Sequence, residues 1–449
     1  MSEKLRAEQS GPPPAEPRLR SLNVSNMIRS MTIGRRSFLQ SAAAAALAWP
    51  RAIDALGQDL QTGGAPVDEE FWSFVRGQFL LPSDRIYLNN GTLGPSPAVV
   101  IEAVAEHPRR VAATYPPGVR WENLKGALGS LLEADPEGFV FPRNTTEAMN
   151  FVANGIDLDA GDEVLITNHE HIGGYKPWEM ICARRGATLV VAHLPTPARS
   201  SEDLFDAVLA AMTPRTRVLA LSHVTFTTGT VLPVTALARE CRERSIIFAV
   251  DGAHPPGMLR VDLQDLGGDF YASSPHKWLL APQGTGLLYM TDEWRTRLWP
   301  TLASGGWDDL DLGAHRFNHF GTFDESRLAG LLAAVEFHAV LGVDRIEARV
   351  RHLRALLQAG LSGLSGIEIA SPQSEELSSA MVSFRLEGVD SLALQSYLSR
   401  AAKVRTRVIG EYDYGWMRLS THIYNRPSDL DRILELLEGV GRDGLPSGD

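Results

Sequence analysis

The chain has 449 residues, of which 44% are hydrophobic and 22% charged, and its 43 Lys and Arg against 54 Asp and Glu give a formal net charge of −11. This composition is that of a folded protein and excludes a disordered, collagenous or coiled-coil chain. The acidic balance argues against non-specific nucleic-acid binding, which needs a basic surface, so we expect small-molecule partners. The two cysteines, Cys182 and Cys241, are too few for a disulfide framework or a clustered thiolate metal site, and both fall on helical patterns.

The first 48 residues differ from the rest, because they carry seven basic residues and only three acidic ones. Residues 34–40, GRRSFLQ, are followed by an alanine-rich stretch that ends in Ala46-Leu47-Ala48. A pair of arginines before a short apolar stretch with a small-residue end is typical of a twin-arginine export signal. The apolar stretch is shorter than the roughly 18 residues that a membrane helix needs. We therefore predict that residues 1–48 engage the twin-arginine export machinery and that the mature protein is periplasmic or secreted, without stable membrane insertion. A disordered basic tail with a chance Arg-Arg is the alternative.

Short apolar runs then alternate with helical patterns along the middle of the chain. The runs are 138–142, 162–168, 187–194, 216–224, 246–254 and 286–291, and the helical patterns between them include 146–156, 177–186 and 234–244. Near-continuous apolar runs of this length are typical of strands in a mostly parallel sheet that helices cover on both faces. The middle of the chain is therefore predicted to have an α/β fold.

Beyond Gly321 the pattern changes. Two long amphipathic helices, 326–342 and 343–361, precede strand candidates at 380–388 and 415–425 and a last helix at 427–441. This part is predicted to form a smaller α+β domain. The expected organisation is a signal at 1–48, an N-terminal segment at 49–84 that packs on the small domain, a large domain at 85–320 and the small domain at 321–445.

In an open α/β sheet, ligands bind beyond the carboxyl ends of the strands, so the polar residues that close each apolar run are candidates for a site. Asn144-Thr145-Thr146 lies between a strand and a helix, where free N–H groups, hydroxyls and the helix dipole suit a phosphate. An ordinary helix cap has the same residues, and both interpretations remain open. Asp251 follows five apolar residues and needs a cation or a donor to face it.

Lys277 lies in the stretch SSPHKW (273–278), among Ser, His and Trp in otherwise apolar surroundings. Desolvation and nearby cations lower the pKa of such a lysine and make its amine nucleophilic, as Schiff-base formation requires. A phosphate cup, a carboxylate and a recessed lysine are the three anchors of pyridoxal phosphate. The carboxylate keeps the ring nitrogen protonated and the lysine holds the aldehyde.

Eight segments occur in the order found in one known family. They are YLNNGTLGPSP (87–97), NTTEAMNFVANG (144–155), HEHIGGYKPWE (169–179), SHVTFTTGTVLPV (222–234), VDGAH (250–254), SSPHKW (273–278), HFGTFDES (319–326) and MRLSTHIYN (417–425). Through them the chain resembles the class V aminotransferase family of fold-type I pyridoxal-phosphate enzymes, which includes cysteine desulfurases and isopenicillin N epimerase. The resemblance implies a large domain with a mostly parallel, mixed seven-stranded sheet, a smaller α+β domain and a homodimer.

The resemblance also implies roles for single residues. Lys277 would form the Schiff base, Asp251 would pair with the ring nitrogen, and His254 would lie beside the phenolic oxygen. His171 would stack on the open face of the ring, and Arg418 would clamp a substrate carboxylate. The residues expected to hold the phosphate are Thr145, Thr146, Ser274 and His276, with Thr322 reaching across from a second subunit, and those expected to border the substrate are Asn90, Gly91 and Thr92.

Three motifs have other interpretations. His169 and His171 are two residues apart at a strand end and point to opposite faces, which argues against a metal site. Gly284-Thr285-Gly286 lacks the third glycine of a dinucleotide fingerprint and precedes a strand. Arg418 as a structural strand arginine remains open.

The chain departs from cysteine desulfurases at two places. Their V-R-T-G-H-H-C loop corresponds to residues 404–410 here, where Gly410 stands at the thiol position. Phe226 stands where desulfurases usually have asparagine, and its ring cannot form a hydrogen bond with cofactor or substrate. Because Gly410 has no thiol and both cysteines fall on helical patterns far from this loop, persulfide chemistry lacks a nucleophile.

We therefore predict an enzyme that acts at Cα of an amino acid or amino-acid-like substrate and resembles the epimerases. Inversion at Cα needs a second acid/base opposite Lys277, for which His171, Tyr412 and Tyr414 are unranked candidates. An aminotransferase or C–S/β-lyase is the alternative enzyme. A protein that binds pyridoxal phosphate without catalysis is the alternative from another class, although retention of Lys277, Asp251 and Arg418 argues against it.

Overall fold

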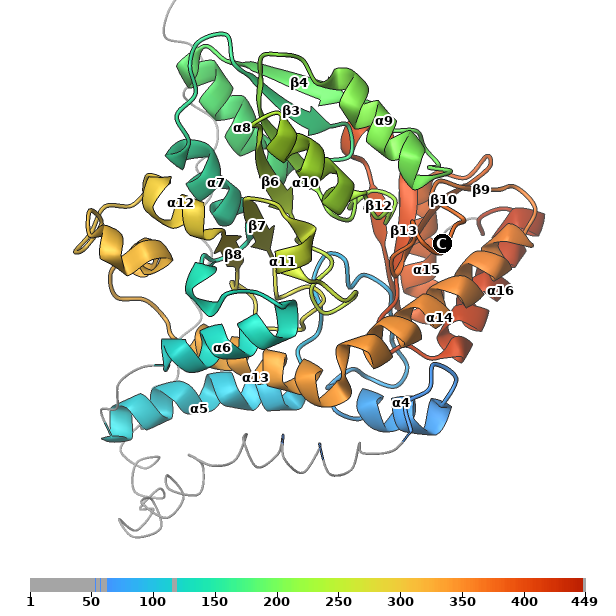
Figure 1. The fold of residues 1–449 in the computed structure, drawn as a ribbon. Coiled ribbons are helices and arrows are strands. Elements are labelled where there is room, and N and C mark those ends of the chain that lie inside the picture. The colour runs from blue at the N-terminus through green and yellow to red at the C-terminus, as the bar shows by residue number, and fades with distance from the viewer. Residues whose placement is uncertain (1–52, 54–56, 58–62, 115–118, 447–449) are drawn as a thin grey trace, which may run out of the picture. The chain divides into compact units, whose positions relative to one another are not determined.

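The computed structural model describes Ile53, Gly57 and residues 63–114 and 119–446 (Figure 1). The predicted signal at residues 1–48 lies outside the described residues and stays a prediction. No single described helix is both long and apolar enough to cross a membrane. The pair α13 (Ser326–Leu341) and α14 (Val343–Ser362), bent by 80° at their junction, meets that criterion only when its two helices are taken together, by length and composition alone.

A seven-stranded sheet forms the centre of the fold. Its strands are β2 (Phe139–Val140), β3 (Glu163–Thr167), β4 (Thr188–Ala192), β5 (Thr216–Ser222), β6 (Ile247–Asp251), β7 (Phe270–Ser273) and β8 (Leu287–Met290), in the order β2-β8-β7-β6-β5-β3-β4. Strands β4, β3, β5, β6 and β7 are parallel neighbours, whereas β8 is antiparallel to both β7 and β2. The predicted mostly parallel, mixed sheet is therefore confirmed.

Successive strand residues bury themselves on opposite faces of this sheet. Leu165, Leu219 and Phe248 belong to one hydrophobic cluster, and their neighbours Ile166 and Ala220 belong to the other. Because both faces are covered, the strands have near-continuous apolar sequences.

Helices supply the two covering layers. The first cluster also takes side chains from α5 (Ala98–Thr114), α6 (Trp121–Leu132), α9 (Ser201–Ala211), α10 (Val234–Glu243), α11 (Leu263–Leu266) and α13. The second takes side chains from α7 (Thr145–Gly155), α8 (Ile172–Arg185), α12 (Asp292–Arg297) and the 3-10 helix η2 (Leu310–Asn318). Figure 1 shows α5, α6 and α13 side by side, so the helix that begins at Ser326 packs with the helices of the large sheet.

A second, antiparallel sheet has the order β12-β13-β10-β9. Its strands are β9 (Ile367–Ile369), β10 (Met381–Leu386), β12 (Arg407–Ile409) and β13 (Trp416–Ser420), and a short parallel pair joins β1 (Ile86–Tyr87) to β11 (Val404–Arg405). Helices α14, α15 (Ser391–Ala402) and α16 (Pro427–Asp443) contribute to the core of this unit, which Figure 1 shows in orange and red. The remaining 3-10 helices are η1 (Pro136–Gly138) and η3 (Glu411–Asp413).

Helix α4 (Glu69–Arg76) packs beside α14. Trp72 and Val75 share a hydrophobic cluster with Val350. The buried Arg349 of α14 binds Glu69 at 2.5 Å and donates to the carbonyl of Asn425 at 3.0 Å. The segment before residue 84 is thus tied to α14 and to the loop after β13.

Candidate active site

A cavity of about 240 Å³ lies at the carboxyl ends of β5, β6 and β7. The loop that follows β1 and the strands β12 and β13 form the rest of its wall. Its lining includes most of the residues that the sequence predicted: Gly91, Thr92, Thr145, Thr146, His171, Asp251, His254, Ser274, His276, Lys277 and Arg418. Residues separated by up to about 330 positions therefore meet at one place. The cavity lies where the strand-end rule predicts a site, because parallel strands expose their carboxyl ends at one edge.

Lys277 lies in a tight turn after β7, with its N–H donating to the Ser274 carbonyl at 2.9 Å. Its Nζ is 3.4 Å from Nε2 of His254, whose Nδ1 accepts the indole N–H of Trp278 at 3.0 Å. Because an indole N–H can only donate, the neutral imidazole carries its proton on Nε2 and presents it to the lysine. Burial lowers the pKa of Lys277 to about 8, with Arg418 and Arg407 acting in the same direction and Asp251 opposing. The amine therefore loses its proton more readily than an ordinary lysine, which favours its nucleophilic form.

Asp251 ends β6 as a buried carboxylate. Its Oδ1 accepts the N–H of Ala253 at 3.0 Å, and burial raises its pKa although Lys277 and that hydrogen bond lower it. A Cβ on Gly174 would lie 2.7 Å from Oδ2, so α8 approaches the carboxylate as closely as a glycine allows. Asp251 also lines the cavity, so a donor bound there can reach its carboxylate.

The start of α7 forms the opposite end of the cavity. Asn144 caps the helix by accepting the N–H of Glu147 at 2.9 Å. Thr145 bonds to Ser274 through its N–H at 3.1 Å and its hydroxyl at 2.8 Å. The cap and the hydroxyl-lined helix start therefore coexist, since different residues supply them. Such a start suits a phosphate.

His276 closes this end. Its Nδ1 donates to the Thr285 carbonyl at 3.0 Å, which leaves Nε2 for the cavity. Burial, aided by Lys277, lowers its pKa to about 4, so the ring is neutral. A lysine amine, a buried carboxylate and a helix start with hydroxyls fit the amine-reactive carbon, the ring nitrogen and the phosphate of pyridoxal phosphate.

His171 is the N-cap residue of α8, with Nδ1 accepting the N–H of Gly173 at 3.1 Å. Its ring meets the ring of Phe226 edge-on at 5.1 Å. Burial, with Lys277, Arg407 and Arg418, lowers its pKa to about 3. His169 turns away to bond with Thr227 and Thr196 and to stack on Tyr414, so the two histidines do not converge on one ion.

Arg418 projects from β13 and is only 1% exposed. Its guanidinium donates to the Phe226 carbonyl at 2.6 Å and to the Thr92 hydroxyl at 3.3 Å, and it forms no ion pair with a described residue. Burial lowers its pKa to about 9. Gly91 lies against it, because a Cβ there would be 2.9 Å from Nη2. The charge of Arg418 is therefore free for a ligand.

Four predicted residues lie outside the cavity wall. Asn90 is buried behind it, where its Nδ2 donates to the Lys277 carbonyl at 3.3 Å and its Oδ1 accepts the Tyr424 hydroxyl at 2.9 Å. Thr322 is exposed. The hydroxyls of Tyr412 and Tyr414 donate to the carbonyls of Glu170 at 2.7 Å and Asn168 at 3.1 Å.

The cavity also contains residues to which the sequence had assigned no role. Ser222 ends β5 beside Asp251 and donates to Glu170 Oε2 at 2.6 Å; burial raises the pKa of Glu170 to about 7. The same strand-end rule would have found Ser222. Phe226 forms part of the wall, and Arg407 projects from β12. No local pattern marks Arg407, because its place depends on the pairing of β12 with β13.

The sheet and the cavity at its carboxyl edge are those of the fold-type I pyridoxal-phosphate enzymes. Residues 118–433 match the model of the aminotransferase class-V family, and the chain belongs to that family. It is 35% identical over 397 residues to isopenicillin N epimerase of Amycolatopsis lactamdurans, with 83% of this chain and 99% of the relative covered. The corresponding enzyme of Streptomyces clavuligerus is 32% identical over 391 residues, with 82% and 98% covered.

Cysteine desulfurases are also similar. A probable cysteine desulfurase of Xylella fastidiosa is 30% identical over 415 residues, with 84% of this chain and 97% of the relative covered. Among solved structures, a C-DES variant with glycine covalently linked to its pyridoxal-phosphate cofactor has a TM-score of 0.72 at 25% identity, covering 81% of this chain and 98% of that one. The cysteine desulfurase CsdA of Escherichia coli has a TM-score of 0.72 at 25% identity, covering 82% and 97%. Pyridoxal phosphate is therefore the cofactor of the site.

Proposed function

We propose that this enzyme inverts the configuration at Cα of an amino acid or of an amino-acid-like substrate, in the manner of isopenicillin N epimerase. The convergence in one cavity of the Lys277 amine, the Asp251 carboxylate and the Arg418 guanidinium, which forms no ion pair with a described residue, supports action at Cα. The similarity to two isopenicillin N epimerases supports inversion as its outcome. When bound, pyridoxal phosphate supplies an electron sink for negative charge at Cα. The chain supplies the acid, the base and the orientation.

Lys277 performs the first proton transfer, and Arg418 and Asp251 assist it. Arg418 binds the substrate carboxylate with its planar fork and so fixes which bond of Cα faces Lys277. Lys277, with a pKa of about 8, is a competent base near neutral pH and takes the Cα proton. Asp251 would keep the ring nitrogen protonated. The phosphate would be held by Thr145, Thr146, Ser274 and His276, which would fix the ring.

Inversion requires that a different group return a proton to the opposite side of Cα. His171 is our candidate, because it lines the cavity while the hydroxyls of Tyr412 and Tyr414 are bonded to backbone carbonyls. Burial lowers its pKa most, and Lys277, Arg407 and Arg418 lower it further. Neutralisation of these cations by cofactor and substrate would remove the second of these contributions.

The thiols support an epimerase over a desulfurase. Cys182 on α8 and Cys241 on α10 are buried, and neither lines the cavity. Burial raises the pKa of Cys182 to about 11 and that of Cys241 to about 12, which keeps both protonated and unreactive. Gly410, at the position of the desulfurase thiol, offers no nucleophile.

A lyase is the second candidate, because one structural neighbour is the cystine C–S lyase C-DES in complex with its product, cysteine persulfide. The same amine and carboxylate would begin that reaction and an amino transfer. The test is to incubate the pure holoenzyme in D2O with L- and D-amino acids, with and without a keto acid. Deuterium at Cα with a change of configuration supports epimerisation. Products of elimination or of amino transfer, without inversion, overturn it, and a cofactor absorption band indifferent to every amino acid points to a binding protein.

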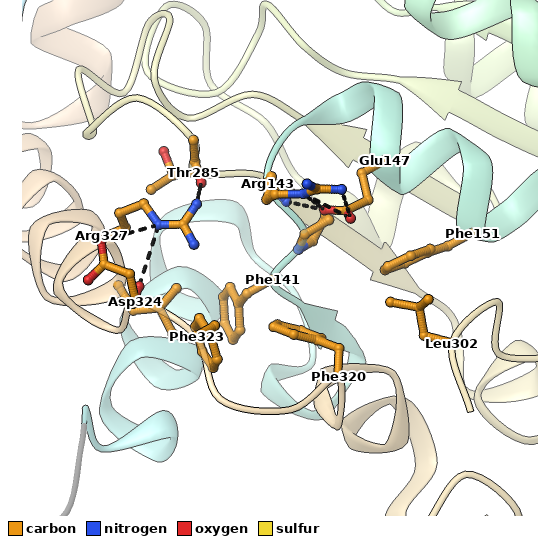
Figure 2. Close-up of a pocket in the computed structure, with 13 residues that line it drawn as sticks. Phe141, Arg143, Glu147, Phe151, Thr285, Leu302, Phe320, Phe323, Asp324 and Arg327 are labelled. Atoms are coloured by element: carbon orange, nitrogen blue, oxygen red, sulfur yellow. Dashed lines mark hydrogen bonds and ion pairs between the residues drawn. The ribbon is translucent and has the colours of Figure 1, made fainter. Parts of the chain in front are cut away.

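We also propose that a second copy of the chain covers a pocket of about 230 Å³ beside α7 (Figure 2). This pocket is lined by Phe320, Phe323, Leu302 and Thr285. The carbonyl of Thr285 accepts a hydrogen bond from His276 of the active site, so the pocket and the active site share this contact. Thr322 lies between the two phenylalanines in sequence. The segment that contains Leu302 also exposes the large side chains of Trp299, Trp307 and Leu310.

Analytical ultracentrifugation tests this proposal. The wild type is expected to sediment as a dimer, and Leu302→Glu is expected to give a monomer that binds the cofactor more weakly. A monomeric wild type overturns the proposal.

We further propose export by the twin-arginine route. Replacement of Arg35-Arg36 by Lys-Lys should retain the protein in the cytoplasm, and unchanged export would contradict this proposal.

A further inference from the structure

Two arginines face each other across the wall of the cavity. Strands β12 and β13 are antiparallel, and their register pairs Arg407 directly with Arg418. Directly opposed residues in such a pair project from the same face of the sheet, with Cβ atoms about 5 Å apart, and like charges there repel. Both side chains line the same cavity. The structure therefore concentrates positive charge at this wall.

The chain itself only partly compensates this charge. Arg418 has no ion pair within the described part of the chain, and Arg407 pairs with Glu411 at the rim, where the two side chains are 26% and 29% exposed. The Nε atoms of both arginines are buried and have no hydrogen-bond partner among the described residues. Of the described carboxylates, Asp251 alone lines the cavity. Both guanidiniums thus retain unused donors.

The residues that would anchor the cofactor are Lys277, Asp251 and the helix start with Thr145, and neither arginine is among them. Both guanidiniums remain for the substrate, and the carboxylate of a simple amino acid brings one negative charge against their two positive charges. The ion pair between Arg407 and Glu411 only weakly neutralises Arg407, because water screens a partly exposed ion pair. A carboxylate of the substrate can therefore replace Glu411 as the partner of Arg407.

We propose that the substrate class is an amino acid whose side chain carries a second anionic group, and that Arg407 selects it. This inference rests on the proposed action at Cα. Arg418 takes the carboxylate next to Cα, and Arg407 takes the distal carboxylate. Phe226 connects the two sites: its carbonyl accepts from Arg418 and its ring lies 6.0 Å from the Arg407 guanidinium. Its apolar ring suits the methylene groups between the two anionic ends of the substrate.

The experiment compares ligands of the same shape that differ in charge. The cofactor absorption band of the holoenzyme is titrated with L-glutamate against L-glutamine and with L-aspartate against L-asparagine. We expect at least one acid to bind about tenfold more tightly than its amide, because a charged pair replaces a neutral contact. Higher salt should narrow this difference, since screening acts on the acid alone.

Arg407→Gln should abolish the preference by weakening the acid while leaving the amide unchanged, whereas Arg418→Gln should weaken both. Arg405→Gln is the matched control, because Arg405 is exposed two residues earlier on β11. Equal binding of both acids and their amides, or a preference that survives in Arg407→Gln, overturns the inference.

Glu411→Gln keeps the inference testable if Arg407→Gln fails to fold. It removes the internal competitor of the distal carboxylate, so the preference for the acid should increase. An unchanged or smaller preference overturns the inference. A cofactor band that responds equally to acids and amides refutes the second anionic group but leaves the proposed action at Cα intact, whereas a band that responds to no amino acid refutes both.

Discussion

His254 presents a fixed N–H to the Lys277 amine across 3.4 Å, because the Trp278 indole occupies its other ring nitrogen. A deprotonated amine can accept that proton, whereas an ammonium group would face a donor. The arrangement therefore acts in the same direction as burial, which lowers the pKa of Lys277. Its consequences can be measured.

Trp278→Phe removes the donor that fixes the imidazole and nearly retains the packing. His254 can then carry its proton on Nδ1 and accept a hydrogen bond from the lysine, so the pKa of Lys277 should rise. The measurement is the pH dependence of cofactor reattachment to the apoprotein, which should move to higher pH. Trp178→Phe is the control, because Trp178 is equally buried but its indole N–H has no partner among the described residues. An identical shift in both variants would contradict the proposed hydrogen-bond chain.

Lys277→Ala should abolish covalent attachment of the cofactor, because among the described residues that line the cavity Lys277 is the only lysine. Borohydride reduction followed by peptide mapping should label the peptide containing Lys277 in the wild type and leave it unlabelled in the variant. Activity should fall by about 10²–10⁴-fold, the usual contribution of a positioned base. Lys176→Ala, on the exposed part of α8, should behave as wild type. A reducible adduct at the same peptide in Lys277→Ala would show the assignment to be wrong.

The stability of the apoprotein should depend on Lys277 at alkaline pH. Its folded-state pKa of about 8 is below the ordinary value of 10.5, so between these values the unfolded chain binds more protons than the folded one. Stability conferred by this group therefore rises with pH across that window. Denaturant unfolding at pH 8 and pH 10 should show a larger gain for the wild type than for Lys277→Met. Since Arg418 titrates with the same sign, only the difference between the proteins is diagnostic.

Gly174→Ala should weaken cofactor binding by roughly tenfold or more, about 1.4 kcal/mol, because its Cβ would meet Asp251 Oδ2 at 2.7 Å and displace the carboxylate. Gly126→Ala on α6 is the matched change, with nothing within 4 Å of the added carbon. It should leave binding unchanged and stabilise the helix by about 1 kcal/mol. Equal cofactor affinity in the two variants would argue against a close approach of α8 to the site.

Replacement of both cysteines by alanine should leave activity within about twofold of wild type, because neither thiol touches the cavity. Loss of buried sulfur should cost roughly 1 kcal/mol per site in the free energy of unfolding. Initial rates and denaturant unfolding check the two effects separately. A folded double variant without activity would restore thiol chemistry as a possibility.

Most strands of the large sheet were predictable because each is a continuous apolar run. Strand β7 was absent from the predicted runs, since Phe270–Ser273 contains alanine and serine and is followed directly by a polar turn. Helix α8 starts at Ile172, five residues before the predicted start at 177. Gly173, Gly174 and Pro177 lower the helix propensity of this turn, while the glycines allow it to approach Thr146 and Asp251.

The amino-acid sequence by itself marked Thr145 and Asp251 as candidates, because each lies at the end of a predicted strand, and Lys277 through its polar neighbours in an apolar stretch. Tertiary structure decided that Arg407 faces Arg418. That contact depends on the register of two antiparallel strands and on the intervening η3 turn, where Tyr412 and Asp413 adopt φ values of 58° and 57°. Register is set by the turn that joins two strands and by the faces that both strands bury, so the residues of β12 alone do not reveal it.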